Sequence, residues 1–412
     1  MNIQDKDHKH GDRSLNLLYT LTSYPPAIGG AQFLQHQTAK ILSPAHEIQV
    51  VAFWDSNRSD WLLGTTIAVS NEAHDYVYDE IPVNRIGFDW LTKFKMGLLL
   101  PWYYLSMGIV VPAMASLLEA YLEPFYNQVD LVHNVRIGRE PLSIASLTLA
   151  HKHQIPFVLT PVHHPRWDGW RYRIYNQLYR DADVVLALTN AEKDILMSLG
   201  VAEARIHVIG MGPILSRESS TDRFRRKRQI EGPIVLFIGQ HYRYKGYVEL
   251  LDSTELVWDK VPNAQFVFIG PPVGNSSSVF SKYSDPRIHF LGKTDLQEKT
   301  DALDACTLLC VPSTQESFGG VYTEAWSFGK PVIGCRIPAV SEVIDDGVNG
   351  ILVDQEPSEI ARNIIMLLQN EGMRESMGAE GKTKAETKYS WGEIASRTEH
   401  AYEFALRNRM SN

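Results

Sequence analysis

Short apolar runs alternate with helical patterns along almost the whole chain. The runs are nearly continuous in Val, Ile, Leu and Phe, which is typical of strands that are buried on both faces of a sheet. Parallel strands need a crossover connection, and the helical segments between the runs supply one. The alternation therefore predicts an α/β fold built from parallel sheets.

The apolar runs form two series that are separated by a charged segment. The first series comprises 15–21, 48–54, 130–135, 156–162, 183–189 and 205–210. The second series comprises 233–239, 264–270, 287–292, 307–312 and 331–335. A chain of 412 residues is too long for one ordinary core, and two domains of roughly 200 residues fit this length. We expect two Rossmann-like domains, 1–212 and 232–412, that face each other across a cleft, and the last helices can pack back onto the first domain.

The segment 213–231 has no apolar period and is rich in charge, so we interpret it as the linker between the domains. Its basic side chains are Arg223, Arg225, Arg226, Lys227 and Arg228. A solvated connector is the simpler interpretation of this cluster. Contact with anionic lipid is the alternative.

Composition narrows the class of protein. Apolar residues make up 44% and charged residues 21% of the chain, which is the balance of a soluble globular protein. The formal net charge of -8 offers no overall positive field to a nucleic acid, and we expect no such partner. Cys306, Cys310 and Cys335 lie in apolar runs without a CxxC pair, which indicates reduced core residues. The polar N-terminus lacks the apolar stretch of a signal peptide, so we expect a cytoplasmic protein.

The segment 96–118 contains no charged residue and is long enough to cross a bilayer. The strands before and after it belong to one predicted sheet, and Pro101 and Pro112 divide it, so we do not expect a membrane span. Two packed helices of the N-terminal domain are the first interpretation. The alternative is a helix pair in the surface of a membrane, at its inner face. The side chains at headgroup level would then be Trp102, Tyr103 and Tyr104.

The sequence 312–334, PSTQESFGGVYTEAWSFGKPVIG, runs from a strand end through a glycine-containing loop into a helix. Backbone N–H groups at such a loop suit a phosphate, and Gly319 and Gly320 permit its close approach. Glu316 and Glu324 would lie about 12 Å apart along a helix, which exceeds the roughly 5 to 9.5 Å of a glycoside-hydrolysing pair. We therefore interpret the two glutamates as groups that bind hydroxyls and not as an acid–base couple.

This stretch resembles the retaining glycosyltransferases of family 4, which have the GT-B fold. The resemblance rests on ESFGGVYTEAWSFGKPVI and on SEVIDDGVNGILV at 341–353. It extends to YPPAIGGAQ at 24–32, to 182–212 and to GQHYRYKG at 239–246, so that nearly the whole chain is covered. The resemblance implies a GT-B fold in which the C-terminal domain holds most of the donor, a UDP- or GDP-sugar.

The resemblance also implies roles for the residues of this stretch. Glu324 would bind the hydroxyls of the nucleotide ribose, and Glu316 would bind the donor sugar. The sugar and the phosphates would meet the backbone amides of Ser317, Phe318, Gly319, Gly320 and Val321.

Lys245 occupies the position at which the family has a lysine on the donor diphosphate, where its charge would stabilise the leaving phosphate. The family usually has an arginine directly after the first glycine of this motif, and this chain has Gln240 there. Either Arg243 reaches in from the same loop, or Lys245 acts with less help. In the N-terminal domain, the amides of Gly29 and Gly30 would face the donor phosphate. A plain strand-to-helix turn is the alternative for these glycines.

A histidine in the loop TPVHHPRW, 160–167, is implied to face the donor sugar across the cleft. The family pattern often places this histidine directly after the proline, and this chain has Val162 there. His163 and His164 follow. We favour His164, because its pair with the next proline aligns best, and keep His163 as the alternative.

We expect neither a metal ion nor a bound cofactor. Asp181 and Asp183 form a DxD pattern, but they straddle a helix end and the start of a buried strand. The GxG of Gly210 and Gly212 lacks the third glycine of a dinucleotide fingerprint.

The sequence therefore predicts an enzyme, a glycosyltransferase that moves a hexose from a nucleoside diphosphate sugar with retention of the anomeric configuration. The resemblance implies that the acceptor attacks the face that the diphosphate leaves, and that the leaving phosphate takes the proton. A glycan, a lipid-linked intermediate and a small molecule all fit as acceptors. Two alternatives are a nucleotide-dependent oxidoreductase, which lacks its fingerprint after the first strand, and a non-catalytic GT-B scaffold, which Gln240 keeps open.

Overall fold

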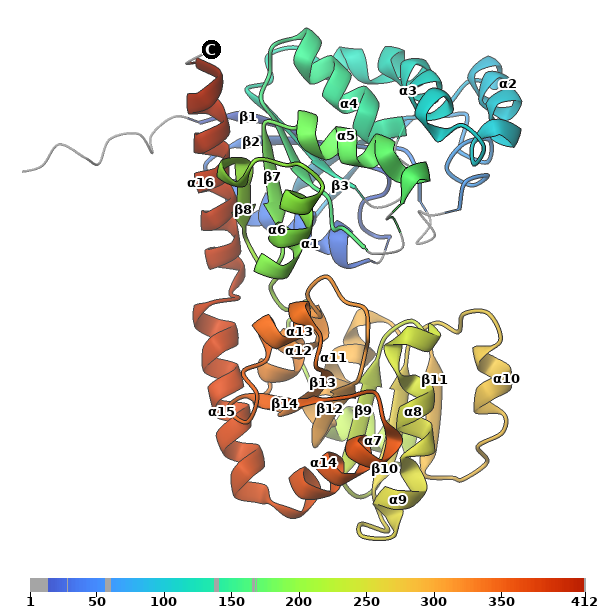
Figure 1. The fold of residues 1–412 in the computed structure, drawn as a ribbon, viewed down its shortest axis with the longest axis vertical. Helices are drawn as coiled ribbons and strands as arrows, with labels where there is room; N and C mark the ends of the chain where they lie inside the picture. Colours follow the sequence, from blue (N-terminus) through green and yellow to red (C-terminus); the bar gives the residue numbers. More distant parts are fainter. Residues whose placement is uncertain are drawn as a thin grey trace, which may run out of the picture.

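The computed structural model describes residues 14–27, 29–55, 61–136, 141–164, 167 and 169–410. These residues form two α/β domains that lie one above the other (Figure 1). Two long helices at the C-terminus run along one side of both domains. The two-domain α/β architecture with parallel sheets, expected from the alternation of apolar runs, is confirmed.

The N-terminal domain is built on a sheet of eight strands among the described residues. They are β1 (Asn16–Leu21), β2 (Glu47–Ala52), β3 (His74–Tyr78), β4 (Ile81–Arg85), β5 (Leu131–Val135), β6 (Phe157–Thr160), β7 (Val184–Ala187) and β8 (Ile206–Val208). Their order across the sheet is β3-β4-β2-β1-β5-β6-β7-β8. Neighbouring strands are parallel except β3 and β4, which form an antiparallel hairpin at the edge. In the middle, Leu17 pairs with Ile48 on one side and Leu131 on the other, and all three are buried.

The C-terminal domain has a second, wholly parallel sheet, with the order β11-β10-β9-β12-β13-β14 in the described part of the chain. Its strands are β9 (Ile234–Ile238), β10 (Gln265–Ile269), β11 (Ile288–Gly292), β12 (Leu308–Val311), β13 (Val332–Cys335) and β14 (Gly350–Val353). The central strand β9 is buried along its whole length. The three cysteines are buried in this domain without a disulfide bond.

Helices cover both sheets and supply the crossovers. Those of the N-terminal domain are α1 (Gly30–Leu42), α2 (Trp90–Leu99), η1 (Leu100–Trp102), α3 (Met107–Leu122), η2 (Glu123–Tyr126), α4 (Pro141–Lys152), η4 (Trp170–Tyr172), α5 (Arg173–Asp181), α6 (Asn190–Ser198) and η5 (Glu203–Arg205). The remaining ones are α7 (Thr221–Arg228), η6 (Arg243–Lys245), α8 (Tyr247–Asp252), α9 (Thr254–Trp258), α10 (Ser276–Phe280), α11 (Leu296–Ala305), α12 (Gly320–Trp326), α13 (Pro338–Val343), α14 (Pro357–Gln369), α15 (Glu371–Thr387) and α16 (Trp391–Met410). Side-chain caps mark several starts. Thr189 accepts from the amide of Glu192, and Asp295 accepts from the amide of Glu298.

The segment expected to be a solvated linker is partly helical, and that interpretation was wrong for α7. Ser220 caps the helix, and Phe224 on its inner side is buried. The basic side chains bind partners on α11: Arg223 pairs with Asp301, and Lys227 and Arg228 share Glu298. Ion pairs attach α7 to α11, and only one apolar side chain of α7 is buried. The sequence of α7 therefore shows no apolar period.

The uncharged segment 96–118 folds as the end of α2, the turn η1 and most of α3. Within the described residues, Met107–Tyr126 is the one helical stretch that is long and apolar enough to cross a membrane. One side of its α3 part, with residues such as Val111 and Met114, packs in the N-terminal core, and 33% of the apolar window is buried. Tyr103 is also fully buried, so the alternative that placed it at headgroup level is wrong for this residue. Trp102 and Tyr104 remain on the surface.

The two C-terminal helices attach to different domains. A Cβ atom on Gly381 of α15 would lie 2.1 Å from the ring of Trp326 of α12, so α15 packs tightly on the C-terminal domain. The hydroxyl of Tyr402 on α16 lies 2.8 Å from the hydroxyl of Tyr19 and 2.6 Å from Nδ1 of His133, both in the N-terminal domain. The chain thus returns to its first domain through α16 (Figure 1).

Candidate functional site

The loops after β9 and β12 are tied together at the carboxyl edge of the C-terminal sheet. The amide of Thr314 donates to the carbonyl of Tyr244 at 2.9 Å. The side-chain amide of Gln355 donates to the carbonyls of Pro312 and Tyr244, at 2.7 and 3.1 Å. Gly246 has a φ of 77°, and a Cβ atom there would lie 2.4 Å from the carbonyl oxygen of Pro312. This close approach requires glycine and fixes the residue before it.

That preceding residue, Lys245, forms an ion pair with Glu316. Its Nζ lies 2.6 Å from Oε1 of Glu316. The lysine side chain is 20% exposed and the glutamate 11%, so water screens the pair only in part. Two sequence-predicted residues that are far apart in the chain therefore meet in a charge-assisted hydrogen bond.

Glu324 on α12 forms a second, more deeply buried pair. Lys299 of α11 donates from Nζ to Oε1 of Glu324 at 2.7 Å. The other oxygen, Oε2, is buried and has no hydrogen-bond partner among the described residues. Burial raises the pKa of Glu324 above its ordinary value, and Lys299 and the nearby backbone amide of Ile214 act in the opposite direction. A buried carboxylate oxygen of this kind is rare in folded proteins and can accept a hydrogen bond from a ligand hydroxyl.

The glycines of the two domains meet at one methionine. Gly319 precedes α12 with a φ of 86°, which favours glycine, and Gly320 begins the helix. A Cβ atom on Gly320 would lie 3.2 Å from Sδ of Met211, and one on Gly30 would lie 3.4 Å from Cε of the same side chain. Gly29 directly precedes Gly30 as the N-cap of α1. The starts of α1 and α12 therefore face each other across Met211.

The loop after β6 carries both candidate histidines, and they point in different directions. Val162 has a φ of 45°, which is strained for a β-branched residue and turns the chain sharply. The buried ring of His163 lies against Tyr179 inside the N-terminal domain, with Nδ1 3.3 Å from its hydroxyl. The ring of His164 lies 5.8 Å from that of Tyr244 in the other domain. His164 is thus the histidine on the side of Lys245.

Hydrogen bonds from side-chain hydroxyls connect this region of the N-terminal domain to the C-terminal domain. The hydroxyl of Ser317 donates to the carbonyl of His163 at 2.8 Å, and the hydroxyl of Thr189 donates to the carbonyl of Ser317 at 3.3 Å. Next to Ser317, Phe318 is buried against Tyr389, and Val321 is half-buried. The loop of residues 317–321 is therefore held between the two domains.

Glu192 on α6 holds the loop after β6 through hydrogen bonds to the backbone. Its Oε1 accepts from the amide of His163 at 2.6 Å, and its Oε2 accepts from the amide of Leu188 at 2.7 Å. Burial raises the pKa of Glu192 to about 7, although both amides and the nearby Arg136 act in the opposite direction. Sequence reasoning missed this residue, because a glutamate three positions after Thr189 looks like an ordinary helix cap.

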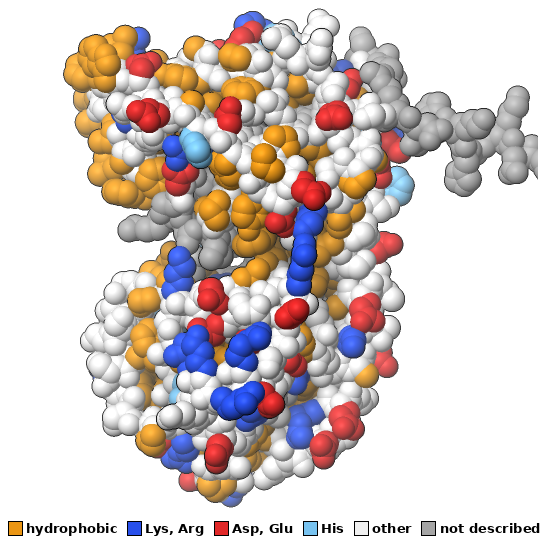
Figure 2. All heavy atoms as spheres, turned by 180° about the vertical axis from the view of Figure 1, so that it is seen from behind, with side chains coloured by type: hydrophobic (Ala, Val, Ile, Leu, Met, Phe, Trp, Pro, Cys, Tyr) orange, Lys and Arg blue, Asp and Glu red, His pale blue; other side chains and the backbone are white. Residues whose placement is uncertain are grey.

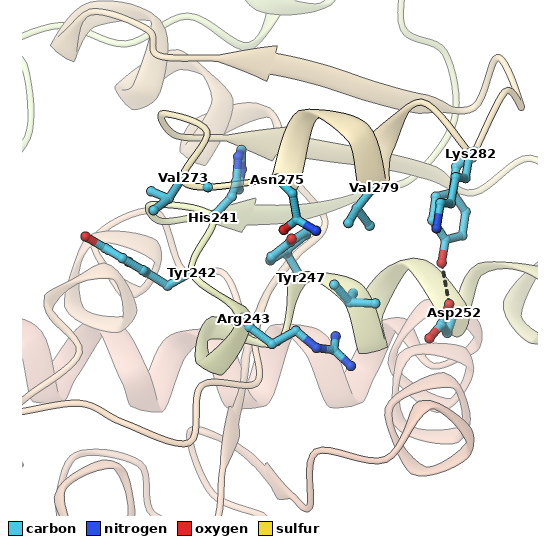
Figure 3. A pocket seen from close by; sticks show the side chains of 12 residues that line it. His241, Tyr242, Arg243, Tyr247, Asp252, Val273, Asn275, Val279 and Lys282 are labelled. Atoms are coloured by element: carbon cyan, nitrogen blue, oxygen red, sulfur yellow. Dashed lines mark hydrogen bonds between the residues drawn. The ribbon is translucent and has the colours of Figure 1, made fainter. Parts of the chain in front are cut away.

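Gln240 and Arg243 do not join the ion pairs of the site. Gln240 lies exposed on the loop after β9. The guanidinium of Arg243 binds Oε1 of Glu249 at 2.7 Å. It lines a cavity of about 600 Å³ together with His241, Asp252 and other side chains of α8 and α10 (Figure 3). Arg243 and Tyr242 extend to opposite sides of the loop in that view.

The candidate metal residues have structural partners. Asp183 accepts from the amide of Phe157 and pairs with Arg409, both through Oδ2, at 2.8 and 2.9 Å. Asp181 binds the side-chain amide of Gln177. Within the described ranges, no group of three or more His, Cys, Asp or Glu residues is placed to hold a metal ion.

The residues of the candidate site thus gather where the domains face each other. They are Lys245, Glu316, Glu324, His164 and the residues of the glycine loops. Figure 2 shows a hollow between the domains on the side away from α15 and α16. Lys299 and Gln355 also belong to this region, and no motif in the sequence pointed to them. A lysine on a helix and a glutamine after β14 have no local pattern that differs from ordinary surface residues.

Comparison with known families covers most of the chain in two parts. Residues 28–217 match the family described as Glycosyltransferase Family 4. Residues 219–384 match the family described as Glycosyl transferases group 1. The two matches meet in the segment between β8 and α7.

Similar proteins include a D-inositol 3-phosphate glycosyltransferase of Corynebacterium kroppenstedtii, which is 29% identical over 56% of this chain and 55% of the relative. A phosphatidyl-myo-inositol mannosyltransferase of Mycobacterium tuberculosis is 31% identical over 42% of this chain and 47% of the relative. The chain therefore matches about half the length of these curated relatives. Among solved structures, Anabaena Alr3699/HepE in complex with UDP-glucose superposes with a TM-score of 0.71, covering 94% of this chain and 99% of the other at 19% identity.

Proposed function

Because the chain belongs to the family 4 glycosyltransferases and has their GT-B fold, we propose that it transfers a hexose from a UDP- or GDP-sugar to an acceptor, with retention of the anomeric configuration. The proposal rests on the site geometry, since the curated relatives match over only about half of their length. The mannosyl- and glycosyltransferase names of those relatives and the UDP-glucose complex of the Anabaena protein support a hexose donor.

The observation that carries the proposal is the buried Oε2 of Glu324, which makes no hydrogen bond of normal geometry within the described part of the chain. A carboxylate oxygen with no hydrogen bond costs free energy in the folded protein, unless a ligand supplies a donor. The vicinal hydroxyls of a ribose are suitable donors. Lys299 holds the other oxygen and so fixes the direction in which Oε2 points.

Lys245 and Glu316 would serve the part of the donor that reacts. As the glycosidic bond breaks, negative charge builds on the diphosphate, and a lysine that is already in place stabilises it. Glu316, released from or shared with Lys245, accepts hydrogen bonds from sugar hydroxyls. The amides at Gly29, Gly30 and residues 317–321 add uncharged donors for the phosphates. The acceptor hydroxyl then attacks on the face that the diphosphate leaves, and a phosphate oxygen takes its proton.

A thermal-shift screen tests this function. The purified chain is heated with UDP, GDP, UDP-glucose, GDP-mannose or NADH, and a true donor at 100 times its dissociation constant should add about 2.7 kcal/mol to the free energy of unfolding. The nucleotide that stabilises the protein identifies the base. Stabilisation by NADH alone would favour an oxidoreductase. Stabilisation by a donor without any release of nucleoside diphosphate, across glycan, lipid and small-molecule acceptors, would favour a non-catalytic scaffold.

A rate assay that follows the release of nucleoside diphosphate tests whether the reaction needs a metal ion. Lysines and backbone amides surround the proposed diphosphate position, so we expect a chelator to leave the initial rate nearly unchanged. Complete loss of the rate, restored by magnesium or manganese, would contradict this expectation.

A further inference from the structure

The N-terminal domain has an apolar surface that the proposed reaction does not use. We call it the α2 face and define it by Trp90, Phe94, Leu98, Trp102, Leu105 and Ile109. The exposed fractions of these side chains range from 58% for Phe94 to 73% for Ile109. Figure 2 shows hydrophobic side chains gathered at the corresponding corner of the upper domain. Large contiguous apolar patches on a soluble protein usually mark an interaction site.

The face follows from the way α2 is attached. Trp90, Phe94 and Leu98 are spaced by four residues and lie on one side of α2. The helix buries Thr92 and Met96 on its other side. Two anchors, Tyr103 and Met107, then fix the chain to the core, so that Trp102 and Leu105 stay outside. The outward side of α2 is therefore more apolar than is usual for a helix on a soluble domain.

The charged residues near the α2 face indicate which kind of partner it binds. Within 90–109 the charged residues are Lys93 and Lys95, and one acidic residue, the N-cap Asp89, stands directly before Trp90. Tryptophan and lysine together are typical of segments that lie in the headgroup region of a bilayer with anionic lipids. The whole chain is acidic, with a net charge of -8, so the charge of this local cationic and aromatic surface is opposite in sign to that of the chain. A second copy of the chain would bring the same lysines against each other.

We propose that the α2 face docks the protein on an anionic lipid bilayer, at the inner face of a membrane. Trp90 and Trp102 lie at headgroup level, Phe94 and Leu98 enter the acyl boundary, and Lys95 contacts lipid phosphates. The surface lies at an outer corner of the upper domain (Figures 1 and 2). If the proposed glycosyl transfer holds, the acceptor is a molecule presented by the membrane, such as a lipid-linked glycan.

Vesicle sedimentation tests the docking with the full chain. Vesicles of phosphatidylcholine mixed with phosphatidylglycerol are pelleted with wild type, with Phe94→Glu/Leu98→Glu, and with Val77→Glu/Leu256→Glu as a matched control. Val77 and Leu256 are exposed apolar residues on β3 and α9, outside the α2 face. The first variant should lose binding more than tenfold, whereas the control should bind like wild type. A Lys95→Glu variant should bind anionic vesicles less, with no change on phosphatidylcholine alone.

Three results would overturn the docking. One is wild-type protein that stays in the supernatant with anionic vesicles, and another is equal loss in the control variant. The third is a dimer in light scattering that the Phe94→Glu/Leu98→Glu variant dissociates, which would assign the face to a second copy. Melting curves and donor-induced thermal shifts of the variants should match wild type. A failure of donor binding in wild type would instead concern the proposed function and leave vesicle binding to be judged separately.

Discussion

At the proposed site, two carboxylates each bind one lysine, and the pairs differ in burial. The Lys245–Glu316 pair lies at a loop edge with some access to water, whereas Glu324 is 4% exposed beside Lys299. A partly exposed pair can exchange its partner for a ligand at small cost. A buried pair cannot separate without leaving an uncompensated charge, so it is better suited to hold a fixed orientation.

Replacing Lys245 by alanine should lower turnover. Charge develops on the diphosphate mainly in the transition state, so the lysine should affect kcat more than donor binding. We expect kcat to fall by roughly a hundredfold to a thousandfold, with the dissociation constant of the free nucleoside diphosphate changing little. Steady-state kinetics and calorimetry measure the two quantities.

Arg243→Ala is the comparison for this variant, because it removes a cation from the same loop. Its guanidinium binds Glu249 in this structure, so we expect a smaller loss of kcat than in Lys245→Ala. An equal loss would show that Arg243 moves to replace the arginine expected at Gln240. In that case, Gln240→Arg should restore part of the activity of Arg243→Ala.

Lys299 should act as a positioning residue for Glu324. Burial raises the pKa of Glu324, and Lys299 acts against that shift, so Lys299→Met should raise the pKa further and leave the carboxyl more often protonated. Donor affinity of the variant should then increase as pH rises, whereas that of wild type should vary less. Calorimetric titration over a range of pH measures this dependence. Lys299→Arg should keep the wild-type profile, and a pH-independent loss in Lys299→Met would indicate a purely steric effect.

At the level of elements, Glu192 joins the loop after β6 to the start of α6. It is fully enclosed, and burial raises its pKa to about 7 from its ordinary value of 4.5. The folded protein therefore binds its proton more tightly than the unfolded chain does. Its contribution to stability is fully present below about pH 4.5 and is lost as pH rises through about 7.

Glu192→Gln should remove this dependence on pH. The shift of the pKa corresponds to a loss of about 3 kcal/mol between pH 4 and pH 8, from 1.36 kcal/mol per unit. Melting temperatures of wild type should fall over this interval by more than those of the variant. The comparison uses the slopes against pH, because the amide also changes two hydrogen bonds. Parallel slopes would mean that Glu192 stays ionised on its two backbone amides.

Most strands of the structure could be predicted from the sequence, and three strands could not. Each predicted apolar run overlaps an observed strand. Most of these strands are buried on both faces and are therefore apolar, whereas the edge strand β11 is only half-buried. The missed strands β3 and β4 form an edge hairpin with exposed and half-buried positions, so their sequence mixes polar and apolar residues. The missed β14 has only four residues and follows a turn directly. Mixed polarity removes the signal of β3 and β4. A length of four residues does not explain β14, since β6, β7, β12 and β13 are equally short and lie in predicted runs.

The sequence predicts those residues of the candidate site that stand in a motif. It does not predict the residues that only packing between elements brings to the site. Glu316, Glu324 and Lys245 stand in patterns that resemble a known family. Lys299 becomes relevant only because α11 lies beside α12, and the direction of His164 depends on the strained turn at Val162. Such relations are set by packing between elements, which the local sequence does not encode.

At the scale of the whole molecule, the domains are joined by the segment after β8 and by the step from α15 to α16. The first connection is anchored by α7 on the C-terminal domain. The second is anchored by α15 on one domain and by α16 on the other. Hydrogen bonds of Ser317 and Thr189 also bridge the domains, and Glu342 of α13 accepts from Asn190 at the start of α6, so α16 is one of several elements that hold the two halves together.

Tyr402→Phe tests this attachment. Its hydroxyl contacts Tyr19 and His133, and burial lowers the pKa of His133 to about 3, so the contact is a hydrogen bond to a neutral ring. Leaving these buried groups short of a partner should lower the free energy of unfolding by about 1–3 kcal/mol. Hydrogen exchange in α16 should accelerate as well. Tyr126→Phe, which loses a bond to the Ser146 carbonyl within the N-terminal domain, is the control. Equal α16 exchange in both variants would show that apolar packing alone holds this helix.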